Sequence, residues 1–221
     1  PIDTDDLLLG WAIASGHFDD YTLDPESGEV AGGTKYFDIA GSTTGVDSTA
    51  VPVVSDDKKS LTLNLKSAEG KDIFRKLVAG ADVVVENFRP DVMPRLGLGY
   101  PALAALQPRL VYCGISGFGQ TGPDADKPAY DQIIQGLSGV MSVTGDERSA
   151  PLRVGYPVCD TIGGLTAAFA VCATLLRAKA TGEGAFLDVS MLDAPLATMG
   201  WVVSNYLNAG VAPRPIGNDN F

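Results

Sequence analysis

The side chains that could do chemistry in this chain are mainly carboxylates, because histidine is nearly absent. His17 is the single histidine and lies in a polar stretch. A Ser-His-Asp triad or a Cys-His pair would have to use it. The cysteines, Cys113, Cys159 and Cys172, are odd in number and show no CxxC spacing. The sequence therefore predicts carboxylate chemistry and no metal site.

Asp160 is the main candidate, because it stands directly before an apolar segment with helical character. An aspartate at that point can act as an N-cap, which contributes about 1 kcal/mol to helix stability. It can also act as a nucleophile, since a helix N-terminus favours the ionised carboxylate. Gly163 and Gly164 would leave room for a ligand above the first turn. Position alone leaves both interpretations open.

A second candidate site is the run Asn87-Phe88-Arg89-Pro90 together with Arg95, which follows a short apolar strand. Open α/β proteins bind ligands at the ends of their strands, and guanidinium groups suit phosphates. An ordinary solvated turn is the alternative.

The run 117–122 matches GxGxxG after a strand, which raises the question of a dinucleotide site. That fingerprint needs a helix to open at its third glycine, so that the helix N-terminus meets the pyrophosphate. Pro123 and Pro128, with acidic Asp124 and Asp126 between them, are poor helix sequence and would repel phosphate. We therefore expect no nicotinamide or flavin dinucleotide here.

Alternating strand and helix signals from Lys58 onward predict an α/β fold, a Rossmann-like parallel sheet flanked by helices. We divide the chain into an irregular acidic arm (1–55), a large Rossmann-like domain (56–200), and a helix end and linker (201–221). The arm holds one short helical patch at Leu7–Ile13. Strands are expected at Ser60–Leu65, Asp82–Val85, Leu110–Ile115 and Phe186–Ser190, and helices at Ala68–Ala79, Pro101–Leu106, Tyr130–Val140, Asp160–Ala180 and Leu192–Asn208.

Composition narrows the class of protein. The net charge of −11 over 221 residues disfavours nucleic acids and anionic membranes as partners. The sequence contains no run of about 18 uninterrupted apolar residues, so we expect no membrane span. The acidic start shows no secretory signal, and the cysteine usage fits a reducing cytoplasm, so we expect a cytoplasmic location. The chain begins with Pro1, which suggests a partial sequence.

Taken in order, these stretches resemble the family III CoA-transferases, which include formyl-CoA transferase and carnitine CoA-transferase. The resemblance covers about Lys58 to Asn218. The matching segments are Lys58–Lys66, Val85–Pro90, Arg95–Tyr100, Pro108–Tyr112, Gly114–Pro123, Tyr130-Asp131, Val154–Asp160, Thr181–Gly184 and Asp188–Ala194.

The resemblance implies a role for each matching residue. Asp160 would be the nucleophile, and Tyr130 would lie nearby with the Gly117–Gly119 loop holding an oxyanion. Coenzyme A would contact a segment that includes Leu63, Leu65 and Lys66, and a second group formed by Asn87, Phe88, Arg89 and Arg95.

The same resemblance implies an acyl-CoA donor, a carboxylic acid acceptor, no metal, and a homodimer of interlocked subunits for the full-length protein. Related α-methylacyl-CoA racemases carry a histidine where this chain has Tyr130. Family members open with a strand-helix-strand unit that nothing before Lys58 matches, and a later glycine-rich loop is missing. An acyl-CoA racemase or epimerase, and an inactive CoA-binding fragment, therefore stay as alternatives.

Overall fold

The computed structural model describes the backbone of residues 9–13, 22–23, 30–31, 36–40, 58–61 and 63–219, and the side chains of 61 and 63–219. Within these ranges the chain forms two compact units. The first contains residues 1–114 and 170–187, and the second 115–169 and 188–221. The three domains expected from sequence stay predictions, and the two units are described separately below.

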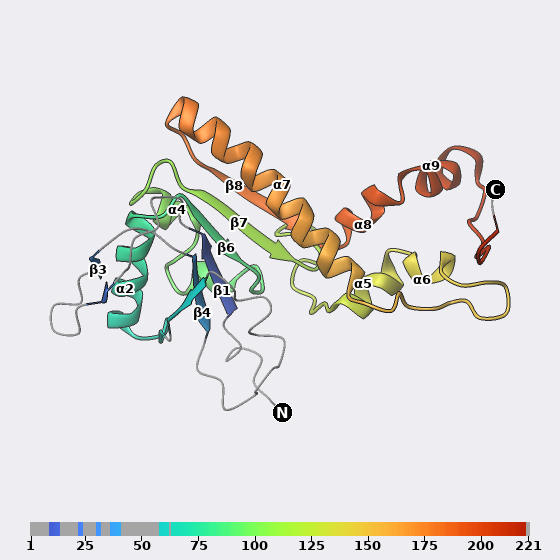
Figure 1. The fold of residues 1–221 in the computed structure, drawn as a ribbon, viewed down its shortest axis with the longest axis horizontal. Coiled ribbons are helices and arrows are strands. Elements are labelled where there is room, and N and C mark those ends of the chain that lie inside the picture. Colours follow the sequence, from blue (N-terminus) through green and yellow to red (C-terminus); the bar gives the residue numbers. More distant parts are fainter. Residues whose placement is uncertain are drawn as a thin grey trace. The chain divides into compact units, whose positions relative to one another are not determined.

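A six-stranded sheet forms the framework (Figure 1). Strands β6 and β7 run parallel, and β8 runs parallel to β7, since Ala185 N donates to Leu110 O and Met191 N to Ser116 O. The expected α/β class with a parallel sheet is therefore confirmed. In spatial order the strands are β5 (Lys58–Ser60), β4 (Tyr36–Ala40), β1 (Leu9–Ile13), β6 (Val83–Glu86), β7 (Val111–Ser116) and β8 (Ala185–Ser190).

The short helix expected at Leu7–Ile13 is wrong for Leu9–Ile13, and residues 7 and 8 lie outside the described part of the chain. Residues Leu9–Ile13 form β1, which lies between β4 and β6 and is antiparallel to both. Two further short strands, β2 (Thr22–Leu23) and β3 (Val30–Ala31), pair with each other. Residues 9–13 thus belong to the sheet.

The helices mostly agree with the expected positions, with shifted ends. Helix α2 matches the expected bounds, whereas α7 begins two residues early and the last expected helix is split. The strand expected over Ser60–Leu65 ends at Ser60, and α3 was not foreseen. The bounds are α2 (Ala68–Ala79), α3 (Val92–Arg95), α4 (Tyr100–Ala104), α5 (Asp131–Leu137), α6 (Val140–Val143), α7 (Val158–Thr181), α8 (Asp193–Thr198) and α9 (Gly200–Ala209).

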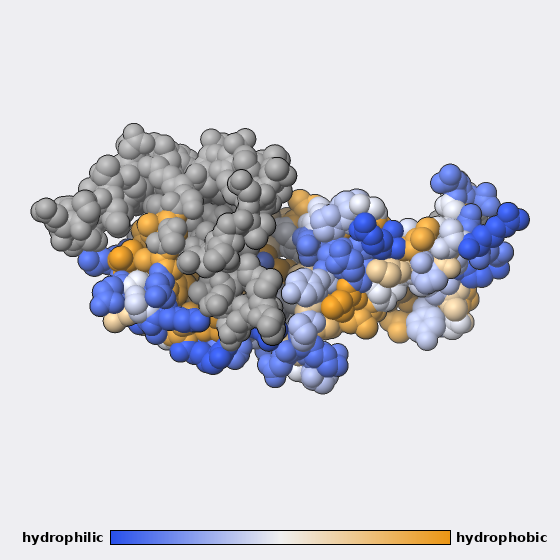
Figure 2. Space-filling model, turned by 90° about the horizontal axis from the view of Figure 1, so that it is seen from below, coloured by the Kyte–Doolittle hydropathy of each residue, from blue (hydrophilic) through white to orange (hydrophobic). Residues whose placement is uncertain are grey.

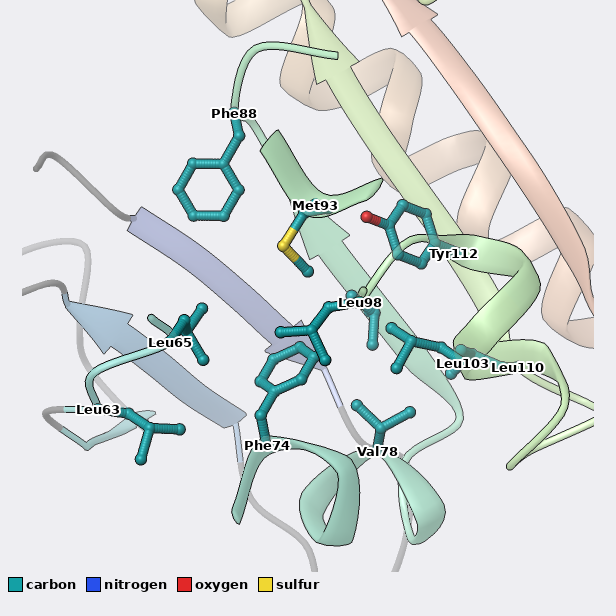
Figure 3. Close-up of a cluster of buried hydrophobic side chains, with 11 residues drawn as sticks. Leu63, Leu65, Phe74, Val78, Phe88, Met93, Leu98, Leu103, Leu110 and Tyr112 are labelled. Atoms are coloured by element: carbon teal, nitrogen blue, oxygen red, sulfur yellow. The ribbon is translucent and has the colours of Figure 1, made fainter. Parts of the chain in front are cut away.

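The core of the first unit lies between α2 and strands β6 and β7 (Figure 3). Helix α2 begins at Ser67, whose Oγ accepts from Gly70 N at 3.0 Å, and it buries Phe74 and Val78 one turn apart. In Figure 3, Phe88 and Tyr112 lie at the opposite end of the cluster from Phe74 and Val78. The cluster comprises Leu63, Leu65, Phe74, Val78, Val84, Phe88, Met93, Leu98, Leu103, Leu110 and Tyr112.

Helix α7 exposes a row of apolar side chains. Leu165, Phe169 and Leu176 recur at helical spacing and are all exposed. Exposed hydrophobic residues are also found elsewhere, since Figure 2 shows orange patches among blue ones on the face that it draws. Among the described residues, α7 is long and apolar enough to cross a membrane, judged by length and composition alone. Soluble proteins have core helices of the same composition, so the absence of a membrane partner stays a prediction.

Candidate active site

Asp160 lies in the first turn of α7, in the second unit, and not at the N-cap position that was one of its two interpretations. The helix begins at Val158 because a side chain from elsewhere satisfies its first amides. Asp131 Oδ1 accepts from Cys159 N at 2.8 Å and from Asp160 N at 3.3 Å. Asp131 is the first residue of α5. The N-termini of α5 and α7 therefore meet, although the two helices are not consecutive in the chain.

Asp131 is a buried carboxylate, with 4% of the residue exposed. Its Oδ2 accepts from Gln135 Nε2 at 2.5 Å, and Gln135 Oε1 in turn accepts from Val154 N at 2.7 Å. Gln135 Nε2 also donates to Tyr156 O at 3.4 Å. These hydrogen bonds fix the segment that leads into α7. They also provide partners for the Asp131 carboxylate, which would otherwise be costly to bury.

The electrostatic environment of Asp160 differs from the one expected. Partial burial of the carboxyl group raises the pKa of Asp160, and the nearby charge of Asp131 raises it further. The causes that shift this pKa are thus burial and a neighbouring charge, and the expected ionised state of Asp160 stays a prediction. Burial and the same charge raise the pKa of the Cys159 thiol to about 11. Asp160 is thus a carboxylate of increased basicity, which favours nucleophilic attack by its ionised form.

Tyr130, the other predicted catalytic residue, directly precedes Asp131 and is 62% exposed. Its main-chain oxygen accepts from Ile133 N and Ile134 N, which fixes the start of α5. The structure thus places Tyr130 next to Asp131 in the chain, and its catalytic role stays a prediction.

The glycine loop after β7 is held by a carboxylate. Gln120 N donates to Asp188 Oδ2 at 2.9 Å and to Oδ1 at 3.1 Å. Gly119 has a φ of +84°, a conformation that favours glycine. Turns and bends follow over 120–127 in place of a helix. The helix that a dinucleotide fingerprint requires is therefore absent from this described loop, and its oxyanion role stays a prediction.

The residues predicted to bind coenzyme A lie in the first unit and separate into buried and exposed groups. Leu63 and Leu65 are buried in the core, while Asn64 and Lys66 are exposed. Asn64 O accepts from Ser67 N at 3.1 Å, which forms a tight turn before α2. A ligand that contacts this segment would therefore meet its main chain and the polar side chains.

The second predicted group shows the same division. Phe88 is 7% exposed and belongs to the core, whereas Asn87 and Arg89 are exposed on either side of it. Arg95 Nε lies 2.8 Å from Asp91 Oδ2 in an exposed pair. Sequence reasoning missed Glu86, whose buried carboxylate accepts from Phe88 N at 2.8 Å. A glutamate that ends the apolar run Val83–Val85 was the available signal.

Among the described residues, no group of three or more His, Cys, Asp or Glu side chains is placed to hold a metal ion. The second unit brings together two carboxylates, Asp131 and Asp160, at the start of α7, and its glycine loop approaches Ala129 and Ile134 at Gly117. In the first unit, both predicted coenzyme A segments carry exposed polar and cationic side chains and contribute apolar residues to the same hydrophobic core.

The Rossmann-like sheet places the chain among the α/β proteins. Comparison with known proteins identifies its family. Residues 30–221 match the model of CoA-transferase family III. The chain belongs to that family.

Several curated relatives have established names. The chain is 44% identical over 161 residues to succinate–glutarate CoA-transferase of Agrobacterium fabrum, covering 73% of this chain and 40% of the relative. It is 45% identical to acetyl-CoA:oxalate CoA-transferase of Acetobacter aceti, covering 75% and 43%. It is 37% identical to human succinyl-CoA:glutarate CoA-transferase, covering 74% and 37%. The chain therefore spans about two fifths of the length of these relatives.

A solved structure of a CAIB/BAIF family protein from Brucella suis superposes with a TM-score of 0.72 at 37% identity. The superposition covers 74% of this chain and 43% of that one. This likeness agrees with the fold described above.

Proposed function

We propose that this chain supplies the nucleophile and part of the coenzyme A site of a CoA-transferase, which moves coenzyme A from an acyl-CoA donor to a carboxylic acid. Family membership supports the activity. The observation that carries the assignment of the nucleophile is the position of Asp160 in the first turn of α7, with its amide hydrogen-bonded to Asp131.

The proposed reaction needs no proton transfer. The Asp160 carboxylate attacks the thioester carbonyl, the C–S bond breaks, and a mixed anhydride and CoA thiolate form. The thiolate attacks the aspartyl carbonyl, which releases the donor acid and leaves an aspartyl-CoA thioester. The acceptor carboxylate attacks this thioester and expels the thiolate. The thiolate then attacks the acceptor acyl group and regenerates Asp160, so that the energy of the thioester is conserved at each step.

The surrounding residues have supporting roles in this scheme. Asp131 holds the first turn of α7 and increases the basicity of Asp160. The Gly117–Gly119 loop provides main-chain N–H groups for the oxyanion, and Tyr130 lies beside the reacting carbonyl. Because every attacking and leaving group is a carboxylate or a thiolate, the scarcity of histidine is consistent with this chemistry.

In this proposal the cationic side chains of the first unit bind the phosphates of coenzyme A. Lys66, Arg89 and Arg95 supply positive charge, and Asn87 supplies hydrogen bonds. Leu63, Leu65 and Phe88 are buried and support this surface from the core. For the complete protein we also propose a cytoplasmic homodimer.

The relatives suggest which acids to test first. The names of the three curated relatives refer to succinate, glutarate and oxalate, all dicarboxylic acids. We propose that the acceptor is a small dicarboxylate, and a panel of such acids with acetyl-CoA or succinyl-CoA as donor tests this choice.

Trapping the covalent intermediate tests the nucleophile. The complete protein is incubated with succinyl-CoA and hydroxylamine, and its peptides are analysed by mass spectrometry. We expect a hydroxamate at Asp160, which is lost in Asp160→Asn and kept in the exposed control Asp126→Asn. Modification at another residue, or full activity of Asp160→Asn, would refute the mechanism. Deuterium incorporation next to the carbonyl of a 2-methylacyl-CoA, without acid exchange, would instead identify a racemase.

A further inference from the structure

Glu86 is a buried carboxylate that the proposed reaction does not use. It is the last residue of β6 and is 4% exposed. Its Oε2 accepts from Phe88 N at 2.8 Å, and its Oε1 accepts from Tyr112 Oη at 3.3 Å. The Tyr112 ring packs against Tyr100 and Phe186, with centroids 6.0 and 5.6 Å away, so its hydroxyl is held in place.

The bond from Phe88 N to Glu86 spans two residues and sets the shape of the turn after β6. With the amide fixed, the Phe88 side chain enters the core, as Figure 3 shows. Asn87 and Arg89, on either side of Phe88, are then directed to the surface. The carboxylate therefore determines how the two exposed side chains of this turn are presented.

Within the described part of the chain, the titratable groups on the elements around Glu86 are these. Tyr112 and Cys113 come from β7, and Arg89 comes from its own turn. The described segment of β1, paired with β6 through Gly10, contains no titratable residue. Arg95 on α3 pairs with Asp91 at the surface. Burial is the main cause that raises the pKa of Glu86 to about 7, and the bonds from Phe88 and Tyr112 lower it by less.

We propose that Glu86 is a positioning residue for coenzyme A, whose ionised carboxylate holds the Asn87–Arg89 turn in the shape that binds the ligand and whose protonation weakens that hold. This inference rests on the proposed function, since it assumes that the turn contacts coenzyme A. Hydrogen bonds to an ionised acceptor are roughly twice as strong as those to a neutral one. The turn should therefore be better ordered above neutral pH than below it.

Glutamine is a suitable probe because it resembles the protonated side chain. In Glu86→Gln the amide oxygen can accept from Phe88 N, and the amide nitrogen can donate to Tyr112 Oη, so both bonds of the core remain. Only the charge is lost. We expect the affinity for coenzyme A at pH 8 to fall about fivefold, corresponding to one charge-assisted bond replaced by a neutral one.

The test is titration calorimetry of the complete protein with coenzyme A between pH 5.5 and 8.5. The wild type should bind more tightly as the pH rises through about 7. Glu86→Gln should keep at all pH values the weaker affinity that the wild type shows at low pH. Glu183→Gln, the same change at an exposed position of the same unit, should follow the wild type. Titration of the phosphates of the ligand affects all three proteins equally and cancels in the comparison.

A second variant keeps the proposal testable should Glu86→Gln fail to fold. Tyr112→Phe removes a bond that lowers the pKa of Glu86, so the midpoint of the affinity change should move to higher pH. Steady-state kinetics add a further readout. The KM for acyl-CoA should rise about fivefold in Glu86→Gln, while kcat stays within about twofold.

The possible outcomes separate the two levels of the argument. If the wild type binds no coenzyme A, the proposed function is refuted, and the ligand role of Glu86 with it. If the wild type binds and Glu86→Gln shows the same affinity and pH profile, only the inference about Glu86 is refuted. An equal affinity change in Glu183→Gln would also overturn it, because the effect would then be one of net charge.

Discussion

Replacing Asp131 by Asn tests the link between the buried carboxylate and Asp160. The asparagine oxygen can keep the bonds from Cys159 N and Asp160 N, but its nitrogen would then face Gln135 Nε2, donor against donor. Gln135 is prevented from turning over, because its Oε1 already accepts from Val154 N at 2.7 Å. The substitution is therefore nearly isosteric but loses one strong hydrogen bond and one charge.

The magnitude follows from these contacts. Loss of a buried hydrogen bond to a charged acceptor costs about 1.5–3 kcal/mol. Loss of a negative charge at the start of α7 costs about 0.5 kcal/mol more. Removal of a buried charge that repels Asp160 offsets part of this cost. We expect a decrease of about 2 kcal/mol in the free energy of unfolding, seen in urea denaturation as a lower midpoint with an unchanged slope.

The same variant should change the pH dependence of the reaction in a defined direction. The Asp131 charge contributes to the raised pKa of Asp160, so its removal lowers that pKa. The acidic limb of kcat/KM, which reports ionisation of the nucleophile, should move to lower pH. Asp126→Asn, an exposed change of the same kind in the same unit, should alter neither property. Wild-type stability together with an unmoved acidic limb in Asp131→Asn would refute this reasoning.

Three further predictions concern stability and reactivity. Because folding raises the pKa of Glu86 from 4.5 to about 7, its contribution to the free energy of unfolding is complete below pH 4.5 and should fall by about 3 kcal/mol as the pH rises to 7. In Glu86→Gln, the free energy of unfolding measured with urea should not show this decrease. The same dependence on pH in the variant and the wild type would contradict the prediction. Gly184→Ala should destabilise the protein by about 2 kcal/mol or more, since the added Cβ would overlap a main-chain carbonyl. Gly164→Ala, with open space around the added Cβ, should stabilise α7 by about 0.5–1 kcal/mol. Equal midpoints of thermal unfolding for the two variants would contradict these expectations. Iodoacetamide at pH 8 should modify exposed Cys172 before buried Cys159, whose pKa is raised to about 11, and mass spectrometry showing the reverse order would contradict the burial of Cys159.

The sequence predicts those elements whose ends carry local signals. Helix α2 agrees with its predicted bounds because Ser67 caps its start and Gly80 follows its end. The start of α7 was placed two residues late because its capping group, Asp131, lies 28 residues away from Cys159 in the chain. A contact across that separation leaves no local pattern, so a sequence reading favours the nearest aspartate, which is Asp160.

Strand β1 was missed for a similar reason. The segment Leu9–Ile13 has an apolar pattern that suits either a helix or a strand, and its pairing decides between them. Gly10 lies opposite Glu86, which is 76 positions further along the chain. The break between α8 and α9 is different, since Gly200 follows Met199 in the sequence and was an available signal.

The site itself was predictable in its residue types and not in its electrostatics. Asp160 was found from its position before an apolar helix and from the family resemblance. The increase in its pKa depends on Asp131 and on how deeply its carboxyl is buried, and neither can be read from spacing. Glu86 was missed because its burial depends on Tyr112 of the neighbouring strand, to which it is bonded at 3.3 Å.

The Asp131–Asp160 pair also bears on how covalent intermediates form in the proposed reaction. Burial and the charge of Asp131 destabilise ionised Asp160, which is why its pKa is raised. In the anhydride and in the aspartyl-CoA thioester the acylated side chain carries no charge, so both penalties disappear. The interaction that raises the pKa therefore also favours acylation over the free enzyme.

This reasoning makes a prediction that does not depend on overall rate. With succinyl-CoA and succinate at fixed concentrations, the fraction of protein present as the aspartyl-CoA thioester is an equilibrium quantity, because forming the thioester consumes succinyl-CoA and releases succinate. Intact-mass measurement should show a smaller fraction in Asp131→Asn than in the wild type, because removing the neighbouring charge stabilises only the free carboxylate. Asp126→Asn should match the wild type. A larger thioester fraction in Asp131→Asn would mean that Asp131 acts by stabilising the ionised nucleophile, the opposite of what the pKa of Asp160 implies.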